Sequence, residues 1–287
     1  MKVNLYYFSG TGNSLFIAKT IQEGIVEEHC RVTGSRNDLE TNVAILPIQK
    51  FTNCETIIDQ SDRIGIIYPT YFLDAPDVVK QFAKRLQIRE GCYLFLYSSY
   101  GETLGNALHN MNQIFEPGQV RGNYEVVLPD NSIIFESKKE EIPKMLEVGE
   151  TIIRAHAKEV YHQRITPLSP YSSKYHLAAN VMKPLARRGL GFKKLKVNQE
   201  KCNHCGLCEK LCPMRNISMP DHLSISKTPV FGNACESCFS CLHYCPQEAI
   251  RYQRMSKKKS GFQYRHPQIR VNEMMDAQQE RATLGSL

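Results

Sequence analysis

The sequence predicts an α/β domain with a doubly wound, parallel five-stranded sheet, followed by a smaller α+β domain built around cysteines. Two observations predict this arrangement. Short apolar runs alternate with helical or loop stretches in the first half of the chain, as a parallel sheet requires. Eight of the 11 cysteines lie in two copies of one spacing further on. We expect domains at 1–163 and 195–253, a basic connector at 164–194 and a tail at 254–287.

The five expected strands are short apolar runs, at 2–8, 43–46, 64–68, 93–97 and 125–128. With the first strand at the centre, their order is 2-1-3-4-5. An amphipathic run at 15–21 predicts a helix after the first strand, 137–163 predicts the last helix of the domain, and 175–185 predicts some helix in the connector. In such a sheet, ligands bind at the carboxyl ends of the strands near the switch point.

The first strand runs into a loop of glycine and hydroxyl residues, with the sequence S-G-T-G-N-S at 9–14. Backbone N–H groups and the dipole of the following helix favour an anion here. Side-chain hydrogen bonds can come from Ser9, Thr11, Asn13 and Ser14. The loop lacks the lysine of a Walker loop and the third glycine of the dinucleotide fingerprint, so a terminal monophosphate is favoured over a nucleoside triphosphate or NAD. A plain strand-to-helix turn is the alternative.

This loop resembles the FMN phosphate loop of flavodoxins, which has the form Ser/Thr-x-Thr-Gly-x-Ser/Thr. The resemblance implies that FMN binds at this loop and at the loops after the third and fourth strands. The residues are Ser9, Thr11, Gly12, Asn13, Ser14, Pro69, Thr70, Tyr71, Phe72, Ser98, Ser99, Tyr100 and Gly101. Tyr71 and Tyr100 are candidates for stacking on the flavin ring, and Gly101 lets the backbone approach it. Residues 129–131, after the fifth strand, form a further candidate loop, with a simple turn as the alternative.

The cysteines follow the spacing C-x2-C-x2-C-x3-C-P twice. The members are Cys202, Cys205, Cys208 and Cys212, then Cys235, Cys238, Cys241 and Cys245. A 4Fe-4S cube needs four thiolates; three closely spaced cysteines wrap three corners and the fourth thiolate comes from elsewhere. Disulfides and zinc are the alternatives, but zinc motifs usually pair two cysteines with a second pair or with histidines.

Residues 195–253 resemble bacterial two-cluster ferredoxins, including the ending C-P-Q-E-A-I of the second motif. In those proteins the last cysteine of each motif binds the other cluster. The resemblance therefore implies a C-terminal ferredoxin domain with two 4Fe-4S clusters. One cluster is assigned to Cys202, Cys205, Cys208 and Cys245, and the second to Cys235, Cys238, Cys241 and Cys212. No side chain is expected to be catalytic.

Charge divides the chain into two unequal parts. Residues 1–150 contain 14 Lys and Arg against 20 Asp and Glu, whereas residues 151–287 contain 22 against 9. A basic shell offsets part of the cost of burying anionic clusters. A basic connector lying on an acidic flavin domain would also help to dock the two domains, which is a hypothesis from the charges alone. A solvated basic face is the alternative.

Other features limit the partners and the location. No helix-turn-helix or base-stacking signature accompanies the lysines, so nucleic acid is not expected. The sequence has no run of about 18 apolar residues and no signal-peptide pattern, so no membrane is expected. Eight cysteines that bind metal as thiolates indicate a reducing compartment, because disulfide formation would compete with metal binding. We expect a cytoplasmic protein.

The whole chain resembles the flavodoxin-ferredoxin fusion proteins of anaerobic bacteria and archaea. That resemblance implies an electron transfer protein that relays electrons between two 4Fe-4S clusters and FMN, to or from a redox protein partner. Two alternatives stay open. One is a flavin-dependent reductase of a small substrate, with His109, Glu102 and Asp74 as nearby polar candidates; the other is a redox-sensing iron-sulfur protein. Whether the chain is an enzyme, and which partner it meets, do not follow from the sequence.

Overall fold

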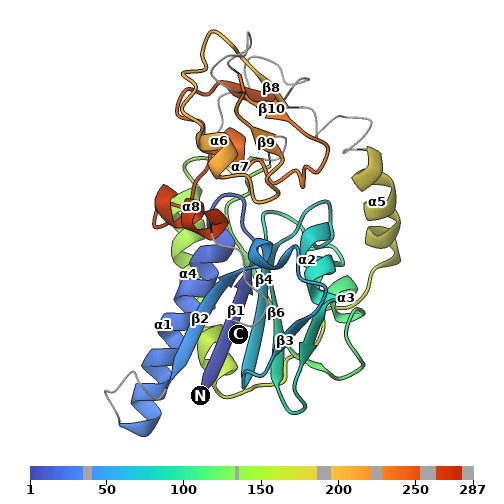
Figure 1. Ribbon diagram of the computed structural model, residues 1–287. Helices are drawn as coiled ribbons and strands as arrows, with labels where there is room; N and C mark the ends of the chain where they lie inside the picture. Colours follow the sequence, from blue (N-terminus) through green and yellow to red (C-terminus); the bar gives the residue numbers. More distant parts are fainter. Residues whose placement is uncertain (35–40, 133–135, 186–194, 221–227, 253–262, 280–287) are drawn as a thin grey trace.

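The computed structural model describes residues 1–34, 41–132, 136–185, 195–220, 228–252 and 263–279, and it shows two modules stacked on one another (Figure 1). The larger module has a parallel sheet in the order β2-β1-β4-β6-β7. Its strands are β1 (Lys2–Tyr7), β2 (Asn42–Pro47), β4 (Arg63–Pro69), β6 (Tyr93–Tyr100) and β7 (Val120–Val127). The expected fold and strand order are confirmed, because β3 (Ile57–Asp59) and β5 (Leu86–Ile88) pair with each other outside this sheet.

Helices cover both faces of the sheet. Helices α1 (Asn13–Thr33) and α4 (Ile142–Tyr161) pack on one face, while α2 (Asp77–Ala83), α3 (Ala107–Asn112) and the 3-10 helix η2 (Ile48–Phe51) belong to the other. The central strand is buried on both sides because its side chains alternate between the two cores. Leu5 and Tyr7 join the core beneath α1 and α4, and Tyr6 joins the core beneath α2 and α3.

The last strand of the sheet differs from the sequence-based expectation. The apolar run predicted a strand at 125–128, but β7 begins five residues earlier, at Val120. Arg121, Asn123 and Glu125 alternate there with buried residues, since β7 is an edge strand whose second face is only partly covered. A search for continuous apolar runs misses such an alternating pattern.

The connector contains a helix where one was expected, α5 (Ser173–Pro184). It stands beside α2 in Figure 1 and is held there by ion pairs. Lys183 pairs with Asp77 and lies 3.7 Å from Asp74. Asp74 also pairs with Lys80 at 2.5 Å. A basic residue of the connector thus contacts acidic residues of the larger module; residues 186–194 lie outside the described part of the chain.

The smaller module is α+β, as expected, and shows an internal duplication. Strands β8 (Leu195–Val197) and β11 (Ile250–Tyr252) pair in an antiparallel manner, as do β9 (Ile217–Ser218) and β10 (Val230–Phe231). Each cysteine motif contains one short helix, α6 (Leu207–Lys210) or α7 (Ser240–His243). The two halves therefore repeat one local plan.

The described part of the tail packs back onto the larger module. Helix α8 (Val271–Gln279) places Met274 and Ala277 in the core that α1 covers, and Glu273 pairs with Lys19 of α1 at 2.6 Å. The sequence left open whether the tail wraps back or frays, and residues 263–279 wrap back. Across the described ranges, no helix is long and apolar enough to cross a membrane.

Candidate functional site

The loop between β1 and α1 has the geometry of an anion site. Gly12 adopts a φ of 103° directly before the helix, and its N–H donates a 3.0 Å hydrogen bond to Oγ of Ser9. Glycine suits this position because residues with a side chain rarely adopt such a φ. Ser14, in the first turn of α1, is fully buried, and its hydroxyl makes no hydrogen bond to any described residue. A ligand oxygen at the helix start would satisfy it.

A cavity of about 590 Å³ opens at the carboxyl ends of the strands, next to this loop. All the residues expected to bind FMN line it except Gly12 and Ser98. Ser98 is buried and does not line the cavity, and its hydroxyl oxygen lies 2.9 Å from the hydroxyl oxygen of Thr70. A Cβ on Gly12 would meet His266 and Ile269 of the tail. The loops of four parallel strands thus converge on one space, as the fold class predicts.

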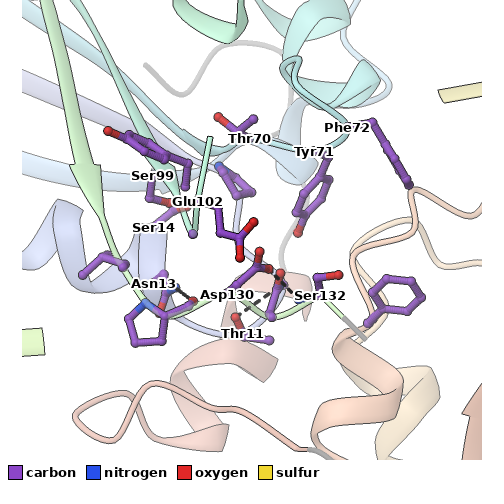
Figure 2. Close-up of a pocket in the computed structure, with 18 of the residues that line it drawn as sticks. Thr11, Asn13, Ser14, Thr70, Tyr71, Phe72, Ser99, Glu102, Asp130 and Ser132 are labelled. Carbon is purple, nitrogen blue, oxygen red and sulfur yellow. Dashed lines mark hydrogen bonds between the residues drawn. The ribbon is translucent and has the colours of Figure 1, made fainter. Parts of the chain in front are cut away.

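Tyr71 enters the cavity on a tight turn. Its N–H donates to the carbonyl of Asp74 at 2.8 Å and its own carbonyl accepts from the N–H of Asp74 at 3.1 Å, while Phe72 and Leu73 between them have φ of 53° and 64°. In Figure 2 the Tyr71 ring and Glu102 approach the middle of the cavity from one side, opposite Thr11. Burial raises the pKa of Tyr71 well above its ordinary value, so its hydroxyl stays protonated.

Tyr100, the other stacking candidate, is the last residue of β6 and also lines the cavity. Its hydroxyl donates a 3.4 Å hydrogen bond to Glu125. Of the polar candidates for a reductase, only Glu102 lines the cavity, and it is exposed. Asp74 is engaged by Lys80 and Asn110 instead. His109 stacks obliquely against Tyr171, away from the lining residues.

The loop after β7 contributes a carboxyl group with a raised pKa to the cavity. Asp130 lines it, and burial, with a smaller contribution from the charge of Glu102, raises the pKa of its carboxyl to about 6. Its Oδ1 accepts a 2.6 Å hydrogen bond from the N–H of Ser132. The sequence marked residues 129–131 as a further candidate loop, and all three line the cavity.

Several lining residues lie outside the predicted set of flavin-binding residues. They are Leu73, Thr103, Leu128, Ser132, Leu185, Ser237 and Phe239. Ser237 and Phe239 come from the cysteine-rich module. Their position depends on how the two modules pack, which no local pattern encodes.

The eight motif cysteines fall into two spatial groups. Cys202, Cys205, Cys208 and Cys245 line one small hollow of the smaller module. The other group is Cys212, Cys235, Cys238 and Cys241, whose thiols lie close enough to affect one another's pKa. Each group thus combines three cysteines of one motif with the last cysteine of the other.

Backbone amides point at the sulfurs in both groups. Asn216 N–H lies 3.2 Å from Sγ of Cys212, and Ala249 N–H lies 3.3 Å from Sγ of Cys245. Burial raises the pKa of Cys238 and Cys241 well above the ordinary value, so thiolates persist there only if a cation offsets their charge. Among the described residues, no three His, Cys, Asp or Glu side chains converge on a single ion.

The two modules meet directly at the cavity. A Cβ on Gly10 would overlap the main-chain oxygen of Cys238 and lie 3.1 Å from the Tyr71 hydroxyl. Val78 N–H, at the start of α2, donates to Glu236 at 3.2 Å. On the other side, His243 Nε2 lies 2.8 Å from the carbonyl oxygen of Asn131.

Residues 263–269 bind the same glycine loop from the tail. The N–H of His266 donates to the carbonyl of Thr11 at 2.9 Å, and the hydroxyl of Tyr264 donates to Oδ1 of Asn13 at 2.7 Å. The imidazole of His266 stacks on Phe16 of α1, with ring centres 4.0 Å apart. The tail thereby fixes the loop that forms one end of the cavity.

A sequence family described as a 4Fe-4S binding domain matches residues 195–218, which contain the first cysteine motif. Solved structures similar to the chain include a flavodoxin from the domain Archaea, at 14% identity and a TM-score of 0.33, covering 56% of this chain and 100% of that one. A Streptococcus pneumonia TIGR4 flavodoxin matches at 16% identity and 0.32, covering 54% and 99%. An FMN-dependent NADH-azoreductase from Bacillus anthracis, solved with FMN, matches at 8% and 0.37, covering 56% and 99%.

Proposed function

We propose that the protein transfers electrons between two 4Fe-4S clusters and an FMN, and exchanges them with a redox protein partner. With these groups bound, the clusters supply one-electron steps and the flavin takes up one or two electrons. The chain's own part is to hold the groups close together in a fixed arrangement.

The cavity fits FMN by its donors and its size. Ser9, Thr11 and Asn13 line the end next to the start of α1, where the helix dipole favours a phosphate. The unpartnered hydroxyl of Ser14 lies there as well. The remaining wall contains aromatic rings and main-chain segments, and its volume of about 590 Å³ lies in the range of pockets for small cofactors.

The two cysteine groups fit cubes by number and by environment. Each has four thiols, and amide N–H groups lie near the sulfurs of Cys212 and Cys245. Such N–H···S hydrogen bonds stabilise the charge on ligating sulfur. We therefore assign the group with Cys202 to one cluster and the group with Cys238 to the other.

The contact between Cys238 and the glycine loop is the observation that carries the proposal. Cys238 is buried, belongs to the core beneath α2 and α3, and packs its main chain against Gly10. Tyr71 lines the cavity beside the same contact. A cluster ligand thus touches the wall of the flavin cavity, whereas Cys205 of the other group is exposed. The exposed group is the one that a partner can approach.

The test starts from protein purified without oxygen, in which FMN and iron per chain are measured. The proposal expects one FMN and about eight irons. Rapid mixing with a one-electron reductant should then bleach the cluster absorption first and the flavin absorption afterwards, at a rate independent of protein concentration. A protein that takes up no FMN, or clusters that never equilibrate with the flavin, would overturn it.

One observation favours a second function. Asp130 places a carboxyl with a pKa of about 6 in the cavity, and a group that titrates near neutral pH can give a proton to a small substrate reduced there. This reading predicts turnover of a small electron acceptor that depends on Asp130. Steady-state reduction of quinones and azo compounds by wild type and Asp130→Asn separates it from pure electron transfer.

A further inference from the structure

The two cysteine motifs share one backbone conformation. In both copies, the residues before and after the second cysteine adopt a left-handed φ. In the first copy they are His204 and Gly206, with φ of 59° and 70°. In the second copy they are Ser237 and Phe239, with φ of 61° and 54°. The loop around each cysteine group therefore demands a left-handed residue at the same place.

The copies differ in what fills the later of these positions. Gly206 takes the left-handed conformation without strain, because glycine has no Cβ. Phe239 takes it with a bulky side chain, which is uncommon and costs conformational energy. Its side chain is 8% exposed and lines the cavity. The ring packs in the core of the smaller module, and the part of it that lines the cavity is what a ligand there can contact.

Ser237 shows a second irregularity in the same loop. It is 3% exposed, lines the cavity, and its hydroxyl makes no hydrogen bond to any described residue. Buried hydroxyls normally have a partner, since leaving one unpaired is costly. Ser240, three residues further on, is equally buried and also makes no such bond within the described ranges, but it does not line the cavity.

We propose that Ser237 and Phe239 are flavin-binding residues, so that the loop of the inner cluster completes the FMN site. The Ser237 hydroxyl hydrogen-bonds the flavin, and the Phe239 ring covers part of it. This inference rests on the proposed function, because it assumes that FMN occupies the cavity. It goes further in making the site composite: the larger module alone holds an incomplete one.

The serine pair provides the test. Protein with both clusters in place is freed of flavin without oxygen and titrated with FMN, following the quenching of flavin fluorescence. Ser237→Ala should raise the Kd roughly five- to twentyfold, as expected for one lost hydrogen bond in a closed site. Ser240→Ala should leave the Kd within about twofold, because its hydroxyl lies outside the cavity.

Phe239→Gly adds a second test, in which iron content and cluster EPR report a loss of core packing separately from flavin binding. Since Gly206 already fills the equivalent position, this variant should keep the wild-type iron content and cluster EPR signals while its Kd for FMN rises roughly tenfold or more. Equal Kd values for Ser237→Ala, Ser240→Ala and wild type would overturn the inference and leave the proposed function standing. A wild-type protein that binds no FMN would overturn both. If Phe239→Gly fails to take up iron, the serine pair decides.

Discussion

The hydroxyl of Tyr264 donates a 2.7 Å hydrogen bond to Oδ1 of Asn13, across 251 residues of sequence. Asn13 in turn donates from Nδ2 to the carbonyl of Pro129 at 3.0 Å. A residue of the glycine loop is thus held from the tail on one side and from the loop after β7 on the other. The shape of this end of the cavity depends on all three segments.

Tyr264→Phe should therefore weaken flavin binding without touching the cavity itself. Loss of one partly buried hydrogen bond costs about 1 kcal/mol, which corresponds to roughly a fivefold rise in the Kd for FMN when the loop must reorder on binding. Titration calorimetry on cluster-loaded protein measures it. Tyr171→Phe is the control, because Tyr171 is an exposed tyrosine that does not line the cavity. Equal effects of the two variants would contradict the prediction.

Gly10→Ala should push the two modules apart. Its methyl group would overlap the main-chain oxygen of Cys238, which cannot rotate away. We expect a loss of about 1 to 3 kcal/mol in unfolding free energy and slower flavin reduction in rapid mixing. Gly34→Ala is the matched control. Its Cβ would meet nothing within 4 Å, so the only cost of this substitution is the backbone strain of alanine at a φ of 68°. The control should leave the flavin rate unchanged, and an unchanged rate in both would refute the contact.

The crossed assignment of the cysteines predicts different losses for two equivalent substitutions. Cys212→Ser and Cys245→Ser should each reduce the iron content from about eight to about four per chain. Only Cys212→Ser should separate the flavin from the remaining cluster, because the group with Cys238 is the one at the cavity. Iron analysis and rapid mixing test this. If each motif held its own cluster, the two phenotypes would be exchanged.

Asp130 makes stability depend on pH in a defined direction. Burial raises the pKa of its carboxyl to about 6, whereas in the unfolded chain it is about 4. The folded state holds this proton more tightly, so ionisation of Asp130 lowers stability as pH rises from about 4 to about 6. Asp130→Asn should have a higher urea midpoint than wild type at pH 7 and a smaller advantage at pH 4. Glu90→Gln, at an exposed residue that does not line the cavity, should show little of this trend. An advantage of equal size at both pH values would count against it.

Lys183→Ala should loosen α5. The ammonium pairs with Asp77 and lies 3.7 Å from Asp74, and its side chain is only 18% exposed. Its loss should speed amide hydrogen exchange in α5 several-fold, and high salt should reduce the difference from wild type. Lys174→Ala, an exposed residue of the same helix, should exchange like wild type.

Local patterns predicted most of the fold, because parallel strands and cysteine motifs are written in short stretches. The loop at 9–14 predicts the start of α1, and the apolar run at 64–68 predicts β4. Neither prediction needs information from distant residues. The first half of β7 was not predicted, because buried and partly exposed residues alternate along this edge strand and no continuous apolar run marks it. The contributions of Ser237, Phe239 and His266 could not be read from the sequence either. Each reaches the cavity or its loop through packing between segments far apart in the chain, and the duplication in the smaller module becomes informative only once φ values are known.

The bond from His266 to Thr11 also has a consequence for biosynthesis. At about 5 to 20 residues per second, a ribosome needs on the order of 10 to 50 s to travel from the glycine loop to the residues that fix it. During that interval the nascent chain lacks α8, which contributes Met274 and Ala277 to the core that α1 covers. The loop is made early and fixed late, because its bonds to the tail can form only after translation has passed residue 266.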